Sequence, residues 1–238
     1  MKIIGLILFD IDGVIRSVEN SYRLSLKKTV YKFSGWEPSY ADIDNAKNEG
    51  IWNNDWDLSL ELIKRYLEKE HLNIEIPPRE KIVKCFEKFY FGGDPKKDSE
   101  DWSGFIKNEE LLVDKKFFDL LESNGIIWGF VSGAESASAK FVLEKRLGLK
   151  SPPLISMGDA PDKPNPKGFI NLSKKLLGNK FGASKIPIAY VGDTIADINT
   201  VINAKKEIPS QKFISIGIAP PHLHSKYRLD ERNSYEKI

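Results

Sequence analysis

The amino-acid sequence predicts an α/β fold, a doubly wound parallel sheet into which an all-α domain is inserted. Short apolar runs alternate with helical patterns along most of the chain, as they do in the β-α units of a parallel sheet. Residues 18–102, about 85 in all, instead carry helical periodicity and no convincing strand. A length of 238 residues, long for one ordinary domain and short for two, is consistent with this division.

The predicted strands are nearly continuous apolar runs, as expected for strands that are buried on both faces of a parallel sheet. These runs cover residues 3–9, 126–131, 153–157, 186–191 and 213–218. Helices are predicted around residues 117–121, 141–147, 169–177 and 195–204. Glycines that can adopt a left-handed conformation follow the first three of these helices.

The inserted region shows three apolar stripes at helical spacing, over residues 22–33, 58–67 and 82–90. Ser39 with Asp42 resembles a capping box for a short helix that ends at Gly50. Glycine, proline and charged residues over 92–101 predict a flexible return to the sheet. We therefore expect a core built from residues 1–17 and 103–238 and a helical domain over residues 18–102.

Composition excludes several classes of protein. Thirty-six Lys and Arg against 34 Asp and Glu give a net charge of +2, which predicts neither a nucleic-acid partner nor a membrane partner. The single cysteine, Cys85, excludes an internal disulfide and a cysteine-based metal site. The longest apolar run is far shorter than the roughly 20 residues of a membrane-spanning helix and lacks the features of a signal peptide. We expect a soluble cytoplasmic protein whose oligomeric state the sequence does not indicate.

Two acidic residues, Asp10 and Asp12, directly follow the first predicted strand. Alternate residues of an extended chain point the same way, so both carboxylates can face one site at the carboxyl end of the sheet. Two carboxylates this close repel each other unless a cation or a shared proton intervenes. The structural alternative is a polar turn at Gly13. A calcium-binding loop is excluded because Val14 stands where a third oxygen ligand would be needed.

Polar residues also follow the second and third predicted strands. Ser132 and Gly133 come directly after the second, where backbone N–H groups can bind an anion, although a serine there can equally cap a helix. Lys163 follows the third strand, and Pro164 and Pro166 stiffen the backbone around it. The alternative for Lys163 is an ordinary exposed lysine in a loop.

Asp193 and Asp197 follow the fourth predicted strand. Aspartate at a helix start is commonly structural, since it caps the N-terminus and matches the helix dipole. Two carboxylates here, facing Asp10 and Asp12 at the same sheet edge, indicate a hard divalent cation such as Mg²⁺. An all-oxygen site also agrees with the scarcity of cysteine and histidine.

These four features occur in the chain as FDIDGVI, VSGA, DKPNPKGF and VGDTIAD. In this order the sequence resembles the haloacid dehalogenase-like (HAD) hydrolase superfamily over residues 3–20 and about 110–218. The resemblance implies a Rossmann-like core, and it makes the inserted helical domain the cap that lies between the first two motifs.

The resemblance also implies a role for each motif residue. Asp10 would be the nucleophile that forms an aspartyl-phosphate, and Asp12 the general acid and then the general base. Ser132 and the Gly133 backbone would bind phosphoryl oxygens, and Lys163 would offset the negative charge around them. Mg²⁺ would be held by Asp10, the Asp12 carbonyl and Asp193. Asp197 would orient a metal-bound water or Lys163 rather than bind the metal directly.

The acid at residue 12 favours phosphate-ester chemistry, because the superfamily's dehalogenases lack it and its transport ATPases carry threonine there. We therefore expect a Mg²⁺-dependent phosphatase acting on a small phosphorylated metabolite, and the sequence does not identify the substrate. The closest alternative is a sugar-phosphate mutase, which shares all four motifs. A phosphoryl-accepting regulatory domain and a catalytically silent binding module are less favoured, because the acid/base residue and all four motifs are present.

The cap would select the substrate. Asn53 and Asn54 could bind substrate hydroxyls, with Trp52 or Trp56 packing against a sugar or ring. The alternative is a helix–helix turn in which Asp55 is the N-cap and the tryptophans lie in the core of the cap. Arg16, next to the first motif, could reach an anionic substrate or could lie on the surface.

Overall fold

The computed structural model describes residues 2–52, 54–182 and 186–219. Its core is a five-stranded sheet in the order β3-β2-β1-β4-β5, with every neighbouring pair parallel. The strands are β1 (Gly5–Phe9), β2 (Ile126–Val131), β3 (Leu154–Ile155), β4 (Ile188–Gly192) and β5 (Phe213–Gly217). All five predicted strands are therefore present, and the prediction of a doubly wound parallel sheet is confirmed.

Four strands, β1, β3, β4 and β5, are shorter than the sequence predicts, and for β3 and β4 the reason is identifiable. β3 ends at Ile155 because the backbone N–H and the hydroxyl of Ser156 both donate to the Asp159 carboxylate, at 2.8 and 2.7 Å, and turn the chain away. β4 begins at Ile188 because Pro187 before it has no N–H to donate to the sheet.

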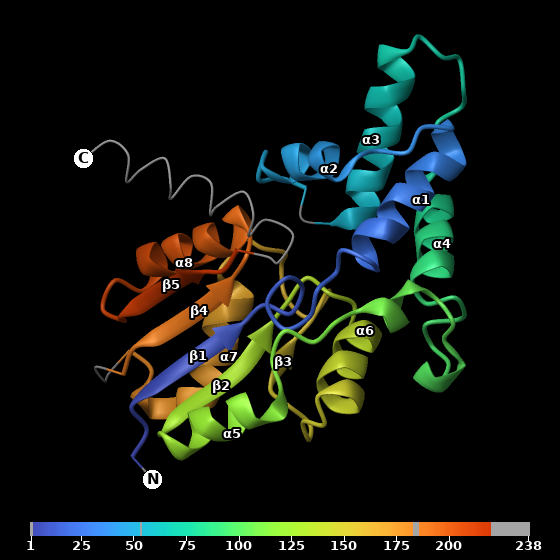
Figure 1. Cartoon of the computed structure of the whole chain (residues 1–238). Helices are drawn as coiled ribbons and strands as arrows, with labels where there is room; N and C mark the ends of the chain where they lie inside the picture. The colour runs from blue at the N-terminus through green and yellow to red at the C-terminus, as the bar shows by residue number, and fades with distance from the viewer. Residues whose placement is uncertain (1, 53, 183–185, 220–238) are drawn as a thin grey trace, which may run out of the picture.

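Helices cover both faces of the sheet (Figure 1). On one face lie α5 (Lys115–Ser123) and α6 (Ser136–Lys140), which continues as a π-helical turn over Phe141–Arg146. On the other lie α7 (Lys167–Leu177) and α8 (Ile195–Glu207). Each face therefore has its own apolar cluster, as doubly wound folds require.

The inserted region forms four helices that stand beyond the carboxyl end of the sheet (Figure 1). These are α1 (Tyr22–Ser34), α2 (Tyr40–Lys47), α3 (Asp55–Lys69) and α4 (Arg79–Tyr90). We call them the helical segment. Their buried side chains form a third apolar cluster, separate from the two against the sheet. The predicted capping box of Ser39 and Asp42 is present at the start of α2, which ends before Gly50.

The chain that follows the predicted return, over residues 102–106, packs firmly on the helical segment. Trp102 is only 2% exposed and packs on Phe91 with ring centroids 4.6 Å apart. The N–H groups of Ser103 and Gly104 donate to the Phe91 carbonyl at 3.0 and 2.8 Å. Because Ile106 is also buried in the third cluster, that cluster extends past the boundary expected at residue 102.

The chain passes twice between the sheet and the helical segment, over residues 15–17 and 110–112. We call these stretches the two crossings. They run antiparallel side by side, because the Ser17 N–H donates to the Glu110 carbonyl at 2.8 Å and the Leu112 N–H donates to the Ile15 carbonyl at 2.9 Å. Both ends of the insertion are thus joined by backbone hydrogen bonds.

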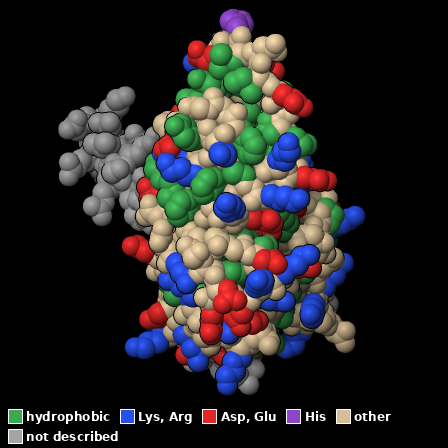
Figure 2. Space-filling view, turned by 90° about the vertical axis from the view of Figure 1, so that its right-hand side faces the viewer, with side chains coloured by type: hydrophobic (Ala, Val, Ile, Leu, Met, Phe, Trp, Pro, Cys, Tyr) green, Lys and Arg blue, Asp and Glu red, His purple; other side chains and the backbone are tan. Residues whose placement is uncertain are grey.

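The surface shows no field of a single charge on the face in Figure 2, where acidic and basic side chains are interspersed. This mixture agrees with the net charge of +2. Within the ranges that the structure describes, no helix combines the length and apolar character needed to cross a membrane.

Candidate active site

The predicted motif residues meet at the carboxyl end of the sheet, where the strand order reverses on either side of β1. Asp10 follows β1 and Asp193 follows β4, and these strands are neighbours. One cavity of about 100 Å³ is lined by Asp10, Asp12, Ser132, Gly133, Lys163 and Asp193. The topology therefore brings six residues from four parts of the sequence to one site.

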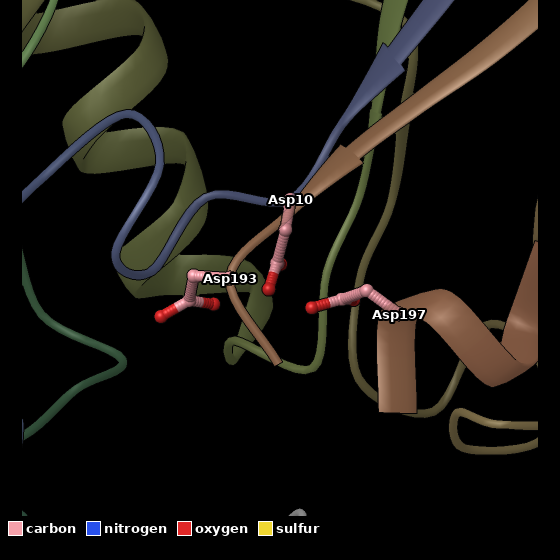
Figure 3. Close-up of side chains that lie close together, drawn as sticks. All are labelled: Asp10, Asp193 and Asp197. Atoms are coloured by element: carbon pink, nitrogen blue, oxygen red, sulfur yellow. The ribbon is translucent and has the colours of Figure 1, made fainter. Parts of the chain in front are cut away.

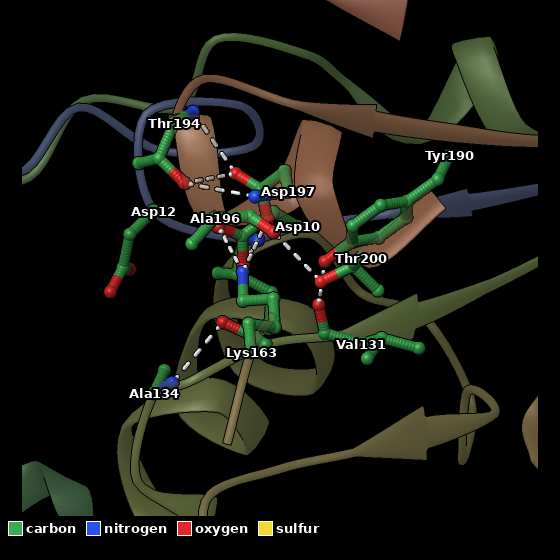
Figure 4. Close-up of polar contacts among 12 residues, drawn as sticks. Asp10, Asp12, Val131, Ala134, Lys163, Tyr190, Thr194, Ala196, Asp197 and Thr200 are labelled. Atoms are coloured by element: carbon green, nitrogen blue, oxygen red, sulfur yellow. Dashed lines mark hydrogen bonds and ion pairs between the residues drawn. The ribbon is translucent and has the colours of Figure 1, made fainter. Parts of the chain in front are cut away.

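Lys163 lies between two carboxylates (Figure 4). Its Nζ is 2.9 Å from Asp10 Oδ2 and 2.6 Å from Asp197 Oδ1. All three side chains are more than nine-tenths buried. Lys163 is therefore not an exposed loop lysine, and its charge is directed at Asp10.

Asp197 is held by its own helix as well as by Lys163. Thr194 is the N-cap of α8, and Asp197 Oδ2 accepts hydrogen bonds from the Thr194 N–H at 3.0 Å and hydroxyl at 2.6 Å. Both carboxylate oxygens of Asp197 are thus engaged. The Thr-x-x-Asp spacing of a capping box was visible in the sequence and would have predicted this contact.

Burial and charge shift the pKa values of these groups. Burial raises the pKa of Asp10 to about 6, even though the cation of Lys163 opposes the shift. Burial alone would lower the pKa of Lys163, but Asp10 and Asp197 raise it well above its ordinary value. Burial disfavours the charged form of Asp197 too, yet Lys163 and the hydrogen bonds from Thr194 outweigh it and lower the pKa of this group.

Asp193 lies near two other carboxylates, and Lys163 and Lys47 offset their effect only in part. Burial, reinforced by Asp10 and Asp197, raises its pKa to about 8. Its carboxylate receives no hydrogen bond from any residue within the described ranges. A Cβ on Gly13, whose φ is +76°, would overlap this carboxylate, so the turn after β1 leaves room for it.

The donor set fits a hard divalent cation. Asp10, Asp193 and Asp197 each offer an oxygen, and the three oxygens lie within 4.8 Å of one another (Figure 3). Asp197 is bound by Lys163 and Thr194, and Asp10 by Lys163 and the Ile11 N–H, whereas Asp193 receives no hydrogen bond among the described residues. Asp193 is therefore the carboxylate best placed for a cation, which would offset the burial and the repulsion that raise its pKa.

Asp12 lines the same cavity, and its carboxylate pairs with the buried side chain of Arg16. Arg16 Nε donates to Asp12 Oδ1 at 2.7 Å, and the Asp12 side chain is 28% exposed. The turn at Gly13 brings the two together, because the N–H groups of Ile15 and Arg16 both donate to the Ile11 carbonyl. Arg16 itself is completely buried and is not among the residues that line the cavity, so the structure places it neither on the surface nor against a substrate in that cavity.

Ser132 is not a helix cap. α6 begins only at Ser136 with Glu135 before it, and the Ser132 hydroxyl instead accepts a hydrogen bond from the Ala134 N–H at 3.2 Å. Ser132 and Gly133 therefore form a short loop between β2 and α6 that faces the cavity. Such a loop can offer a hydroxyl and backbone N–H groups to an anion.

The family follows from a match over most of the chain. Residues 4–205 match the family model described as haloacid dehalogenase-like hydrolase. The chain belongs to the haloacid dehalogenase-like hydrolases. This HAD assignment confirms the family and the hydrolase class expected from the four motifs.

Solved structures share the HAD fold at low sequence identity. Phosphatase Tt82 from Thermococcus thioreducens has a TM-score of 0.66 and 21% identity, with 90% of this chain and 92% of that one covered. A HAD hydrolase of family IA, variant 3, from Entamoeba histolytica has a TM-score of 0.55 and 16% identity, covering 91% and 85%. A Thermotoga maritima protein provisionally assigned as a β-phosphoglucomutase has a TM-score of 0.54 and 13% identity, covering 94% and 98%. Identities this low show the fold alone.

A curated relative is longer. Imidazoleglycerol-phosphate dehydratase from Phytophthora nicotianae is 28% identical over 229 residues, which are 94% of this chain but 45% of that protein. The chain therefore spans less than half the length of this relative.

The helical segment supplies the opposite wall of the HAD cavity. Its lining residues include Tyr22, Arg23, Lys47, Asn54 and Trp56. The sequence singled out only the last two, because nothing local shows which faces of inserted helices turn toward a distant sheet. The position of these side chains is set by tertiary packing alone.

The predicted substrate residues of the helical segment have mixed outcomes. Asn54, rather than Asp55, is the N-cap of α3, and its Oδ1 accepts from the N–H groups of Trp56 and Asp57 at 3.0 and 3.3 Å. Trp52 and Trp56 pack against the apolar cluster of the helical segment, as the structural alternative expects, although Trp56 also lines the cavity. Asn53 lies outside the described residues.

Proposed function

We propose that this HAD hydrolase is a Mg²⁺-dependent phosphatase that hydrolyses a small phosphate monoester through an aspartyl-phosphate on Asp10. The observation that carries the proposal is the position of Asp10, buried at the end of β1 with Lys163 Nζ at 2.9 Å and Asp12 in the same cavity. A nucleophile, a cation and an acid/base group are the parts that phosphoryl transfer to water requires.

In the first step a carboxylate oxygen of Asp10 forms a bond to phosphorus as the bond to the leaving oxygen breaks. Asp12 gives its proton to that leaving oxygen, so an alcohol departs. In the second step Asp12 takes a proton from a water molecule whose oxygen attacks phosphorus. The bond from phosphorus to Asp10 breaks, inorganic phosphate leaves, and both carboxyl groups return to their starting states.

The rest of the cavity binds the phosphoryl group. We assign the Ser132 hydroxyl and the Gly133 N–H to phosphoryl oxygens, and Lys163 to the negative charge that they carry. Asp197 holds Lys163 at 2.6 Å and so fixes the direction of that charge. These residues at the sheet edge, which we call the sheet wall of the cavity, can thus bind a phosphate before the helical segment contacts the leaving group.

A divalent cation would be held by the carboxylates of Asp10 and Asp193, with the Asp12 carbonyl as the third protein ligand that the family resemblance implies. When bound, it supplies positive charge that neutralises the phosphoryl group and permits Asp10 to approach it. The raised pKa of Asp193 supports this assignment, because burial and the neighbouring carboxylates disfavour its negative charge and a cation would offset both.

The size of the cavity favours a small substrate. About 100 Å³ beneath the helical segment can take a phosphoryl group and a short leaving group, and cannot take a folded protein. The relative from Phytophthora nicotianae is named for an imidazole-bearing phosphate. Imidazole-bearing phosphate monoesters therefore belong in the substrate panel beside sugar, polyol and hydroxy-acid phosphates.

The test compares phosphate release from this panel with and without Mg²⁺, for the wild type and Asp10→Asn. We expect release that needs the metal and disappears in the variant. Isomerisation of a sugar phosphate without net phosphate release would replace the phosphatase by a mutase. Phosphate that stays on Asp10 would indicate a regulatory domain. An absence of turnover on every compound would contradict the proposal.

A further inference from the structure

The deepest charged group near the cavity is Arg16, which contacts no solvent. Its Nε lies 2.7 Å from Asp12 Oδ1 and its Nη1 lies 2.9 Å from Glu109 Oε2. The Glu109 side chain is also fully buried. Arg16 therefore joins the predicted acid/base residue to a carboxylate 93 positions further along the chain.

Burying an ion pair of this kind is unfavourable in free energy. Removing two charges from water costs several kcal/mol per ion, and apolar residues of similar volume often replace such pairs without loss of stability. Stability alone therefore does not account for Arg16 and Glu109. Their geometry gives a second reason, since one end of the pair is the carboxylate that must face the leaving group.

Glu109 is fixed from several directions. Its Oε1 accepts hydrogen bonds from the Ser21 hydroxyl at 2.8 Å and the Tyr90 hydroxyl at 2.9 Å. Its backbone carbonyl accepts from Arg146 Nη1 at 2.6 Å. Ser21 directly precedes α1, and Tyr90 is the last residue of α4. The start and the end of the helical segment therefore each supply one hydrogen bond to the Glu109 carboxylate. The Arg16 guanidinium is therefore paired with a carboxylate that Ser21 and Tyr90 connect to the helical segment.

Both charged residues lie at the passages between sheet and helical segment. Arg16 is part of the first crossing and Glu109 directly precedes the second. The contacts form a continuous series from the cavity outward: Asp12 to Arg16, Arg16 to Glu109, and Glu109 to Tyr90. A shift of the helical segment would be transmitted to Asp12 through this series.

We propose that Arg16 is a positioning residue that fixes the carboxyl group of Asp12 toward the leaving oxygen, and that Glu109 and Tyr90 tie this orientation to the helical segment. The proposal rests on the acid/base role of Asp12 in the proposed function. Arg16 is the one side-chain partner of the Asp12 carboxylate among the described residues. A general acid must lie within about 2.6–3.2 Å of the atom it protonates, so a carboxyl group free to rotate protonates less well.

The choice of leaving group separates positioning from a merely structural role. The p-nitrophenolate group leaves without a proton, whereas an alkoxide leaves only if an acid protonates it. The ratio of kcat/KM for an alkyl phosphate to kcat/KM for p-nitrophenyl phosphate therefore reports on Asp12. Because kcat/KM covers only the steps up to formation of the aspartyl-phosphate, the later hydrolysis does not affect it.

The experiment measures this ratio for the best alkyl phosphate of the panel. We expect Arg16→Met to lower it by about tenfold or more, mainly through kcat, and Arg16→Lys to restore part of the loss. Arg65→Met is the matched control, because Arg65 pairs with Glu49 and Glu61 on the exposed side of the helical segment. We expect this control to leave the ratio unchanged.

Tyr90→Phe tests the connection to the helical segment with little risk to folding, since it removes one hydroxyl and keeps the ring. We expect it to lower the ratio by about two- to fivefold. Tyr66→Phe is its control, because Tyr66 stacks on Trp36 away from the cavity. Circular dichroism checks the fold of each variant.

Two results would overturn the proposal. A folded Arg16→Met enzyme in which both substrates lose activity equally, or neither does, would remove the positioning role. An unchanged ratio in Tyr90→Phe would remove the connection to the helical segment. In both cases the metal-dependent activity of the wild type and its loss in Asp10→Asn would still stand, so this failure is distinct from failure of the phosphatase proposal.

Discussion

The two walls of the cavity are built in different ways. On the sheet wall, Lys163 lies between Asp10 and Asp197 at 2.9 and 2.6 Å and is almost fully buried. On the helical wall, Lys47 pairs with Asp55 at 2.7 Å, and 29% of the lysine side chain is exposed. A buried cation with two fixed partners supports chemistry, whereas a partly exposed pair can exchange partners when a substrate enters. The comparison predicts that the sheet wall sets the rate and the helical wall sets the substrate.

The largest loss of activity is expected when Lys163 is replaced. Lys163→Met would leave Asp10 and Asp197 facing each other without a cation, and phosphoryl oxygens without a counter-charge. We expect kcat to fall by about a hundredfold to a thousandfold, measured as phosphate release at saturating substrate. Lys167→Met is the control, because Lys167 is exposed at the start of α7 and should leave kcat unchanged. A loss below about fivefold would contradict the assigned role.

The raised pKa of Asp193 should make the stability of the metal-free protein depend on pH. The folded protein holds a proton there up to about pH 8, whereas an unfolded aspartate releases it near its ordinary pKa of 3.8. Between these values the folded state binds more protons, so the stability of the metal-free protein falls as pH rises. We expect its melting temperature in a chelator to decrease from about pH 5 to pH 8, and to decrease less in Asp193→Asn.

Added Mg²⁺ should reverse this trend, because the cation replaces the proton on Asp193. The gain in melting temperature on adding the metal should therefore grow as pH rises toward 8. Asp197 does not obscure the measurement, since its pKa is lowered and its contribution changes only below the ordinary value. The pKa of Asp10 is raised to about 6, so its contribution is nearly complete by about pH 7, and the gain between pH 7 and pH 8 reports on Asp193. A metal-induced gain that is constant from pH 5 to pH 8 would show that Asp193 does not bind the cation.

A smaller effect is expected on the helical wall. Lys47→Met removes a charge that lines the cavity without touching Lys163 or Asp10. We expect KM for the true substrate to change by about tenfold or less while kcat for p-nitrophenyl phosphate stays within about twofold. Lys69→Met, at the exposed end of α3, is the matched control. A loss of kcat as large as that of Lys163→Met would contradict the prediction that the sheet wall sets the rate and the helical wall sets the substrate.

The smallest effect is expected at Asn54. Asn54→Ala removes the N-cap of α3, which we expect to lower the free energy of unfolding by about 1 kcal/mol in urea denaturation. Asn54→Asp keeps an acceptor for the same N–H groups and should retain most of that stability. If Asn54→Ala leaves kcat/KM on the true substrate unchanged, its role is capping alone and not recognition.

The difference between the walls also explains what the sequence could predict. The strands are visible as apolar runs, and the motif residues follow strand ends, so the chain order alone places Asp10, Lys163 and Asp193 at one sheet edge. The sequence left Arg16 open between a substrate contact and the surface, because its environment depends on Glu109, 93 positions away. Tyr90 was visible only as a member of an apolar stripe, and the hydroxyl that contacts Glu109 carries no signal in the sequence.

The antiparallel pairing of the two crossings has a consequence for how such proteins diversify. The backbone bonds from Ser17 to Glu110 and from Leu112 to Ile15 place the start and the end of the helical segment next to each other. An insertion of different length or shape that starts and ends at these points would leave the strand order and the sheet edge as they are. The entropy of closing an inserted loop grows only slowly with its length. The fold thus permits the exchange of one module for another while Asp10, Lys163 and Asp193 keep their places at the sheet edge.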